Sequence, residues 1–220
     1  MLNRDDVFDE LGIGPVWRLR DATVPDTVQG DTAYTWDQLI DAVARCTRCK
    51  LSATRTRGVP GVGDRNADWL VVGEAPGADE DRLGEPFVGQ AGKLLDAMLA
   101  SIGLRRGENV YITNVLKSRP PGNRNPEADE VAACRPYLLA ELQLVQPKLI
   151  LALGRFAAQS LLDTDLAIAR LRGQVHRFRN VPLVVTYHPA YLLRNLPDKA
   201  RAWEDLCLAR RTYLSLIPDP

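Results

Sequence analysis

The chain has 220 residues, of which 45% are hydrophobic and 25% are charged. These are ordinary values for a folded domain, so they exclude a disordered, collagen-like or coiled-coil protein. No run approaches the roughly 18 uncharged apolar residues that a membrane span needs, and the N-terminal sequence lacks the apolar core of a signal peptide. We therefore expect a soluble, cytoplasmic, monomeric protein without a membrane partner.

The formal net charge is zero, because 28 lysine and arginine residues balance 28 aspartate and glutamate residues. A globally basic nucleic-acid-binding protein is therefore not indicated. The charges are unevenly distributed along the chain, however. Residues 1–41 hold nine acids against three bases, whereas residues 45–65 hold six bases against one acid and residues 170–220 hold nine against four. A basic surface strip is compatible with the zero total.

The predicted elements begin after an acidic stretch rich in turn residues. We expect residues 1–33 to form a loosely held N-terminal extension and residues 34–217 to form one domain. Within that domain we expect, in chain order, a helix over WDQLIDAVARC, a strand over 70–73, a helix over GKLLDAMLASIG, a strand over 110–116, a helix over 128–146, a strand over 149–154, a helix over RFAAQSLL, a strand over 182–188 and a helix over 198–216. Four apolar strands separated by helices predict an α/β fold, with a mostly parallel four-stranded sheet covered on both faces.

The loops that follow these strands are the candidate site, because ligands of such sheets bind beside the carboxyl ends of the strands. The first loop begins with GEAPG at residues 73–77. This turn would present backbone N–H groups to a bound oxygen and hold the Glu74 carboxylate at the sheet edge. An ordinary β-turn with a solvated acid explains the same five residues.

Phe87 and Asn114 are two further candidates in or near these loops. The Phe87 ring lies between glycines, where it is either a core anchor or a platform for a nucleobase; stacking is worth about 1–3 kcal/mol per base. Asn114 interrupts an apolar strand, and its paired donor and acceptor suit a base edge. Uracil presents an N3–H donor beside the O4 acceptor and cytosine reverses both, so one oriented amide distinguishes them. A strand-end asparagine that caps a loop is the alternative.

The chain has two histidines. His188 ends the last predicted strand and precedes Pro189, which makes it a candidate donor to developing negative charge. His176 lies in the segment VHRFR, which we interpret as a hairpin-like surface stretch without a catalytic role.

Cysteines provide the remaining signal. Cys46 and Cys49 form a CxxC among basic residues, and Cys134 follows much later in the chain. In a chain of this kind, cysteines are more often metal ligands, catalytic groups or core residues than disulfides. Three thiols do not complete a four-cysteine cage. Cys207 has the spacing of a core position in an amphipathic helix, and we interpret it as a packing residue.

Taken together, the segments resemble the family 4 uracil-DNA glycosylases, the iron–sulfur-containing branch of that superfamily. The resemblance runs in collinear order over CTRC, GVGD, DWLVVGEAPG, EDRLGEPFVGQAGKLLD, VYITNVLKSRPPGNRNP, ACRPYL, LILALG, LRG and TYHPAYLLR. Each segment alone is weak evidence, but the ordered set is specific. It implies a three-layer α/β/α fold and an enzyme that flips uracil out of DNA and hydrolyses its N-glycosidic bond to leave an abasic site.

The resemblance also implies roles in base recognition. Phe87 would stack on uracil, Asn114 would read its N3 and O4 edge, and His188 would donate to O2 of the departing anion. Glu74 would stabilise the cationic sugar or position the attacking water. The other implied uracil contacts are the turn residues Gly73, Ala75 and Gly77, and Glu80 beside C5, where its side chain would exclude the thymine methyl.

The implied DNA contacts follow His188. Leu192 or Leu193 would enter the minor groove as the wedge that fills the vacated stack. Arg194 and Lys199 would meet phosphates.

A 4Fe–4S cluster is the implied cofactor, with one departure from the family pattern. Relatives carry four cluster cysteines, the third in a KCRPP segment, whereas this chain reads KSRPP and has Ser118 at the position of the missing fourth ligand. Serine ligates iron only as an alkoxide-like oxygen, which is harder than a thiolate. We hypothesise that Cys46, Cys49 and Cys134 hold a labile cluster; the alternative is that the chain holds none.

Two other interpretations of the same segments differ in function. The first is a uracil-DNA binder that traps its product covalently, a branch with glutamine at the position of Ala75 and an extra basic, histidine-bearing loop. Ala75 and the lack of such an insertion argue against it. The second is a non-catalytic DNA-binding relative with a degraded cluster site, and the presence of all the pocket residues argues against that.

Overall fold

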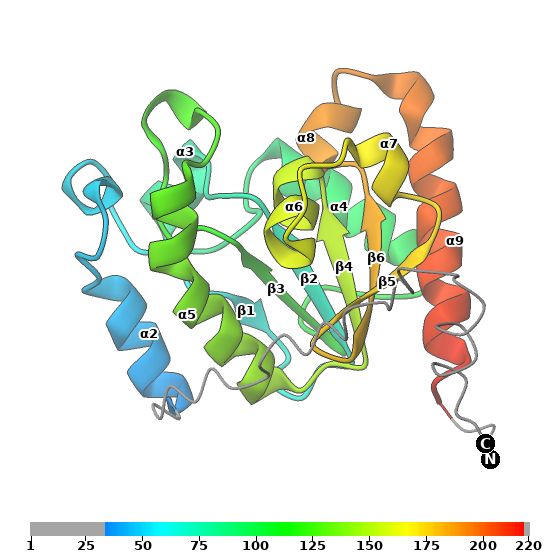
Figure 1. The fold of residues 1–220 in the computed structure, drawn as a ribbon, viewed down its shortest axis with the longest axis horizontal. Coiled ribbons are helices and arrows are strands. Elements are labelled where there is room, and N and C mark those ends of the chain that lie inside the picture. The colour runs from blue at the N-terminus through cyan, green and yellow to red at the C-terminus, as the bar shows by residue number, and fades with distance from the viewer. Residues whose placement is uncertain (1–33, 218–220) are drawn as a thin grey trace, which may run out of the picture. The chain divides into compact units, whose positions relative to one another are not determined.

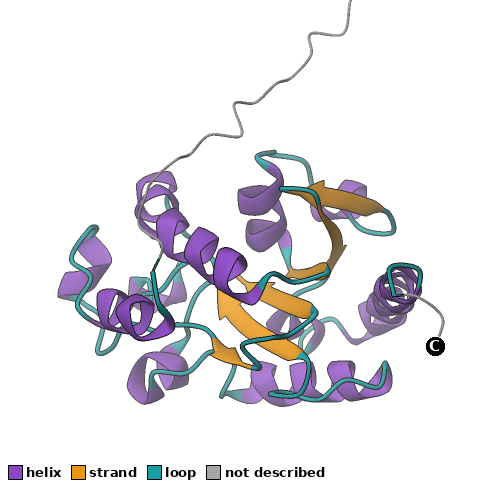
Figure 2. Cartoon of the chain, turned by 90° about the horizontal axis from the view of Figure 1, so that it is seen from below, coloured by secondary structure: helices purple, strands orange, loops and turns teal. Residues whose placement is uncertain are grey.

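The computed structural model describes residues 34–217. They form a six-stranded sheet with helices on both faces, which confirms the expected three-layer α/β/α class (Figures 1 and 2). The extension expected for residues 1–33 lies outside the described residues. None of the helices within residues 34–217 combines the length and the apolar character that crossing a membrane requires.

The sheet has the order β1-β3-β2-β4-β6-β5. Its four central strands run parallel and coincide with the four expected strands: β2 (Trp69–Gly73), β3 (Val110–Asn114), β4 (Leu149–Leu153) and β6 (Val181–Thr186).

The expected number of four strands was wrong, because an antiparallel strand closes each edge of the sheet. These are β1 (Val62–Gly63) and β5 (Val175–Phe178). Neither has the continuous apolar run that marks a buried strand. β1 has two residues, and in β5 only Phe178 is buried, so the segment with His176 is an edge strand whose imidazole contacts the Leu171 carbonyl.

Two layers of helices cover the sheet (Figure 1). The longer helices are α2 (Trp36–Ala44), α4 (Gln90–Ser101), α5 (Ala128–Val145), α6 (Arg155–Leu162) and α9 (Lys199–Leu214). The short ones are α3 (Ala78–Leu83), α7 (Ile168–Leu171) and α8 (Pro189–Leu192), with single 3-10 turns at Lys50–Ala53, Pro121–Asn123 and Leu196–Asp198.

The core is divided by the alternation of side chains along each strand. Leu70 and Val72 of β2 belong to the cluster that includes residues of α5 and α6. Trp69 and Val71 belong to the cluster on the other face, with residues of α4 and α9. Helix α2 packs outside α5 through Leu39 and Val43. Because both faces are covered, ligands can reach the sheet only at its ends.

Candidate active site

A cleft of about 700 Å³ opens at the carboxyl ends of the parallel strands. Its lining comes from the loops after β2, β3, β4 and β6, as the sequence predicts. Of the predicted site residues, Glu74, Ala75, Gly77, Glu80, Phe87, Asn114, His188 and Arg194 line it. Gly73 lies behind this lining, and Leu192 and Leu193 lie outside it.

The floor of the cleft depends on a close approach at Gly73. A Cβ atom there would lie 2.3 Å from Asn114 Oδ1 and 2.4 Å from the Phe87 ring. No real side chain tolerates such contacts, so only glycine lets the Phe87 ring and the Asn114 amide meet over β2.

Phe87 is buried, and its backbone has a φ of 56°, which is uncommon for a residue other than glycine. Arg106 anchors this conformation, because its two Nη atoms donate to the carbonyls of Pro86 and Phe87 at 3.1 and 2.8 Å. A strained backbone that its surroundings hold firmly is typical of a functional platform. Arg106 lies outside every motif considered above, so no sequence pattern indicates its role.

Glu80 braces the same loop. Its Oε1 accepts hydrogen bonds from the amides of Val88 and Gly89 at 2.9 and 3.0 Å, and its Oε2 accepts one from Gly77 at 3.1 Å. The Gly77 amide is therefore committed to Glu80 and is not available to a bound oxygen. The Glu80 carboxylate is fixed at the edge of the cleft.

Asn114 ends β3 with a side chain that is almost fully buried. Its Oδ1 has no hydrogen-bond partner among the described residues. A buried acceptor left unpaired costs about 1–3 kcal/mol, so a polar ligand in the cleft that donates to this oxygen gains correspondingly.

His188 begins α8, and its environment selects one neutral tautomer. Its Nδ1 accepts a hydrogen bond from the Ala190 amide at 3.2 Å, which leaves the proton on Nε2. Burial lowers the pKa of His188 to about 4; Glu80 opposes this shift and Arg194 adds to it. The imidazole is therefore neutral near pH 7 and can donate from Nε2. Its ring stacks on Phe87, with centroids 5.5 Å apart.

Glu74 is the acid of the cleft. Burial raises the pKa of its carboxyl to about 6, although the Arg155 guanidinium nearby opposes the shift. The carboxylate is ionised at neutral pH but only partly solvated. This is the state in which it stabilises an adjacent positive charge best.

Three arginines, Arg124, Arg155 and Arg194, line the cleft together with these acids. Arg124 is paired with Glu127 and Glu130, so Arg155 and Arg194 are the guanidinium groups of this cleft without an ion pair inside residues 34–217. Beyond the cleft, Leu193 is exposed whereas Leu192 is buried in the core. Of the two wedge candidates, only Leu193 is therefore free to contact another molecule, together with the exposed Lys199.

The three predicted cysteine ligands lie close enough together to influence one another. Burial raises the pKa of the Cys134 thiol, and Cys49 and Cys46 raise it further. Backbone amides donate to two of the sulfurs, from Arg48 to Cys46 Sγ at 3.5 Å and from Lys117 to Cys134 Sγ at 3.4 Å. Hydrogen bonds to sulfur are one means of tuning iron–sulfur clusters. Half-buried Cys207 lies in α9, on the opposite side of the fold from α2 and the CxxC (Figure 1).

The fourth ligand position differs. Ser118 is buried, and its hydroxyl accepts a hydrogen bond from Arg55 Nη1 at 2.7 Å. Arg55 Nη2 also donates to the carbonyls of Ala44 and Cys46. Across residues 34–217, no three His, Cys, Asp or Glu side chains are placed to share a single metal ion. A cluster distributes its ligands over several irons; the donors present are three neighbouring thiols and, at the fourth position, a hydroxyl that Arg55 contacts.

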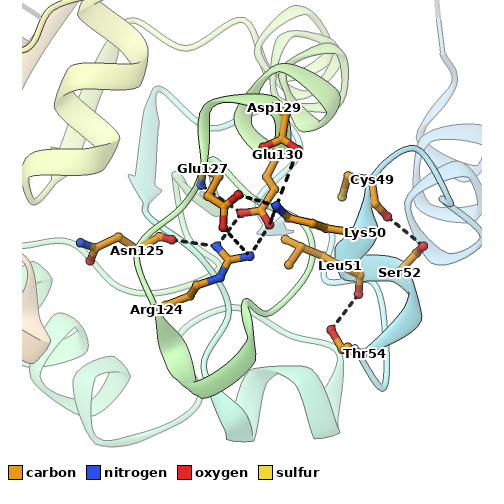
Figure 3. A network of polar contacts seen from close by, with 10 residues as sticks. All are labelled: Cys49, Lys50, Leu51, Ser52, Thr54, Arg124, Asn125, Glu127, Asp129 and Glu130. Carbon is orange, nitrogen blue, oxygen red and sulfur yellow. Dashed lines mark hydrogen bonds and ion pairs between the residues drawn. The ribbon is translucent and has the colours of Figure 1, made fainter.

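A network of ion pairs joins the cysteine segment to the cleft (Figure 3). Lys50, next to Cys49, pairs with Glu127 at the start of α5. Arg124, from the cleft wall, makes a two-pronged contact with the fully buried carboxylate of Glu130, with 2.9 Å from Nη1 to Oε2. This contact holds the pKa of Glu130 below its usual range. Lys50 is one of the basic residues beside the CxxC, but no sequence pattern relates it to Glu127, or Arg124 to Glu130.

The raised pKa of Glu74 predicts a pH-dependent stability effect. Because its pKa is 4.5 when unperturbed and about 6 in the folded chain, ionisation above pH 6 destabilises the fold. Glu74→Gln should raise the thermal unfolding midpoint at pH 8, and the gain should vanish below about pH 4.5. The exposed Glu85→Gln variant is the control. An equal gain at both pH values would mean that packing, not ionisation, explains the effect.

Comparison with known proteins agrees with this architecture. The model of the uracil DNA glycosylase superfamily matches residues 60–207. A type-4 uracil-DNA glycosylase of Archaeoglobus fulgidus is 50% identical over 165 residues, or 71% of this chain and 82% of the relative. A type-4 uracil-DNA glycosylase of Pyrobaculum aerophilum is 40% identical over 83% of this chain and 97% of the relative. A type-5 uracil-DNA glycosylase of the same organism is 31% identical over 71% of this chain and 83% of the relative. The chain therefore belongs to the uracil-DNA glycosylase superfamily.

Proposed function

We propose that this chain excises uracil from DNA by hydrolysing the N-glycosidic bond, leaving an abasic site. The observation that carries the proposal is the convergence of Asn114, His188 and Glu74 on one cleft. They offer an acceptor with no partner in the described part of the chain, a neutral donor and a poorly solvated carboxylate, respectively. Similarity to type-4 uracil-DNA glycosylases supports the same activity.

Base recognition follows from the Asn114 amide. Uracil N3–H donates to the unpaired Oδ1, while O4 accepts from Nδ2. Cytosine carries an acceptor at N3 and a donor at N4. Its N3 would therefore face the acceptor Oδ1, and its N4 amino group would face the donor Nδ2, so neither hydrogen bond forms. Phe87 stacks on the base, and the Glu80 carboxylate, held by three amides, excludes a methyl group at C5.

Bond cleavage follows from the charge that develops as uracil leaves. The departing base is an anion delocalised over O2 and O4, and the sugar becomes cationic. The Nε2–H of His188 donates to O2, while the Glu74 carboxylate stabilises the sugar cation or positions the attacking water. A neutral donor suits this role, since it needs no proton uptake at neutral pH.

Duplex DNA must present the uracil outside its base stack for this chemistry. Leu193 fills the vacated position as the wedge, and Arg194 and Lys199 contact phosphates. The arginines at the cleft make the affinity for DNA salt-dependent despite the zero net charge.

For the cofactor, we infer that Cys46, Cys49 and Cys134 hold a 4Fe–4S cluster with Ser118 at the fourth position. When bound, such a cluster would cross-link the CxxC segment to α5, which carries Cys134. The Arg55 guanidinium beside Ser118 favours an anionic group there.

The decisive experiment for the activity uses a labelled oligonucleotide with one uracil, followed by alkali. We expect strand scission at the uracil and nowhere else. A protein–DNA adduct that survives denaturation would instead support covalent trapping, and binding without scission would support a non-catalytic relative. An oligonucleotide with thymine in place of uracil is the control.

His188→Ala tests the donor. Removing one such donor should slow single-turnover excision by about 100-fold. The affinity for an oligonucleotide with a non-cleavable 2′-fluoro-deoxyuridine should change far less, because the donor acts mainly on the developing anion. His176→Ala, on the edge strand β5, should leave both unchanged. Equal losses in rate and affinity would contradict a transition-state role.

Iron analysis tests the cluster. Protein purified without oxygen should contain about four irons and matching acid-labile sulfide per chain, and lose them in air faster than the Ser118→Cys variant does. Cys207→Ser should leave the iron content unchanged, because Cys207 lies in α9. Less than about one iron per chain in anaerobic protein would contradict the proposal.

A further inference from the structure

Lys117 and Glu141 form an ion pair inside the domain. Their side chains are 1% and 0% exposed, with Nζ and Oε2 2.6 Å apart. Neither residue lines the cleft, and the chemistry proposed above uses neither. Charges are rarely buried to this extent, because the loss of hydration is a penalty that the attraction between them often fails to offset.

All three hydrogens of the Lys117 ammonium have partners. Besides Glu141, Nζ donates to Thr113 Oγ1 at 2.5 Å and to the carbonyl oxygen of Asn114 at 2.8 Å. Glu141 is equally satisfied, since it accepts from Thr113 Oγ1 at 2.7 Å and from the Gly61 amide at 2.8 Å. The network therefore closes around the last two residues of β3.

The backbone of the same turn is tied to the catalytic loop. The amide of Val115 donates to the Gly73 carbonyl at 2.9 Å, and that of Leu116 donates to the Glu74 carbonyl at 3.0 Å. The Lys117 side chain thus contacts, on the side away from the cleft, the segment 114–116 that lies beside Gly73 and Glu74.

We propose that Lys117, held by Glu141, is a positioning residue that fixes the direction of the Asn114 side chain and so sets the discrimination between uracil and cytosine. The inference rests on the proposed function. Asn114 Oδ1 has no hydrogen-bond partner within the described residues, so the direction of this side chain depends on its backbone and on its packing at Gly73. The Lys117 ammonium is the charged group that contacts that backbone.

The test separates positioning from stability. The double variant Lys117→Met/Glu141→Leu replaces the ion pair by apolar side chains and leaves no unpaired buried charge, so it should stay folded. The single Lys117→Met variant leaves the Glu141 carboxylate buried without its cation, so it should be less stable than the double variant. Leu142→Ala, a core change next to Glu141 on α5, is the control for lost stability alone.

Affinity is measured for duplexes with non-cleavable 2′-fluoro-deoxyuridine or 2′-fluoro-deoxycytidine at the same position, and the ratio of the two is compared between variants. We expect the ratio of the two affinities to fall roughly tenfold in the double variant, which corresponds to about one well-oriented hydrogen bond. We expect Leu142→Ala to keep the ratio of the unaltered chain. Asn114→Asp provides the reference for a lost amide.

Three results would overturn the inference. An unchanged ratio in the double variant would mean that Asn114 keeps its direction without Lys117. An equal loss in Leu142→Ala would mean that lowered stability explains the effect. If the unaltered chain shows no preference for uracil, the proposed function fails and this inference fails with it.

Discussion

The cleft depends on a buried oxygen, Asn114 Oδ1, that has no hydrogen-bond partner among the backbone and side chains of residues 34–217. The fold accommodates this because Gly73 allows the amide and the Phe87 ring to come together, and because Arg106 and Glu80 hold the ring's loop. In the proposed function, a base with a donor at the right place supplies that partner.

Electrostatics in the cleft follow from partial burial more than from net charge. The same removal of water moves the pKa of Glu74 up and that of His188 down, so an ionised acid and a neutral imidazole coexist near pH 7. In the proposed reaction, the positive charge that develops on the sugar and the negative charge that develops on the base therefore each meet a suitable group. The arginines around the cleft do not neutralise Glu74, whose proton affinity stays above that of a solvated acid.

Much of this arrangement could be predicted from sequence, because the carboxyl ends of parallel strands lie at one edge. Glu74, Asn114 and His188 each follow or end an apolar run, and the structure brings them together. The edge strands β1 and β5 were missed because short, half-exposed strands lack an apolar pattern. The sequence could not tell which of Leu192 and Leu193 is exposed, because this depends on how α8 is oriented on the core. The contacts of Arg106, Glu130 and Lys117 join residues that no local pattern relates.

One lone pair on His188 serves two parts of the molecule. By accepting the Ala190 amide, Nδ1 both selects the tautomer that donates into the cleft and starts α8, the helix that precedes Leu193. A replacement that kept only the acceptor would lose the donor aimed into the cleft, and one that kept only the donor would lose the N-cap of α8. Two requirements therefore restrict substitution at this position. A replacement that preserves both must provide an acceptor and a donor on opposite sides of one ring.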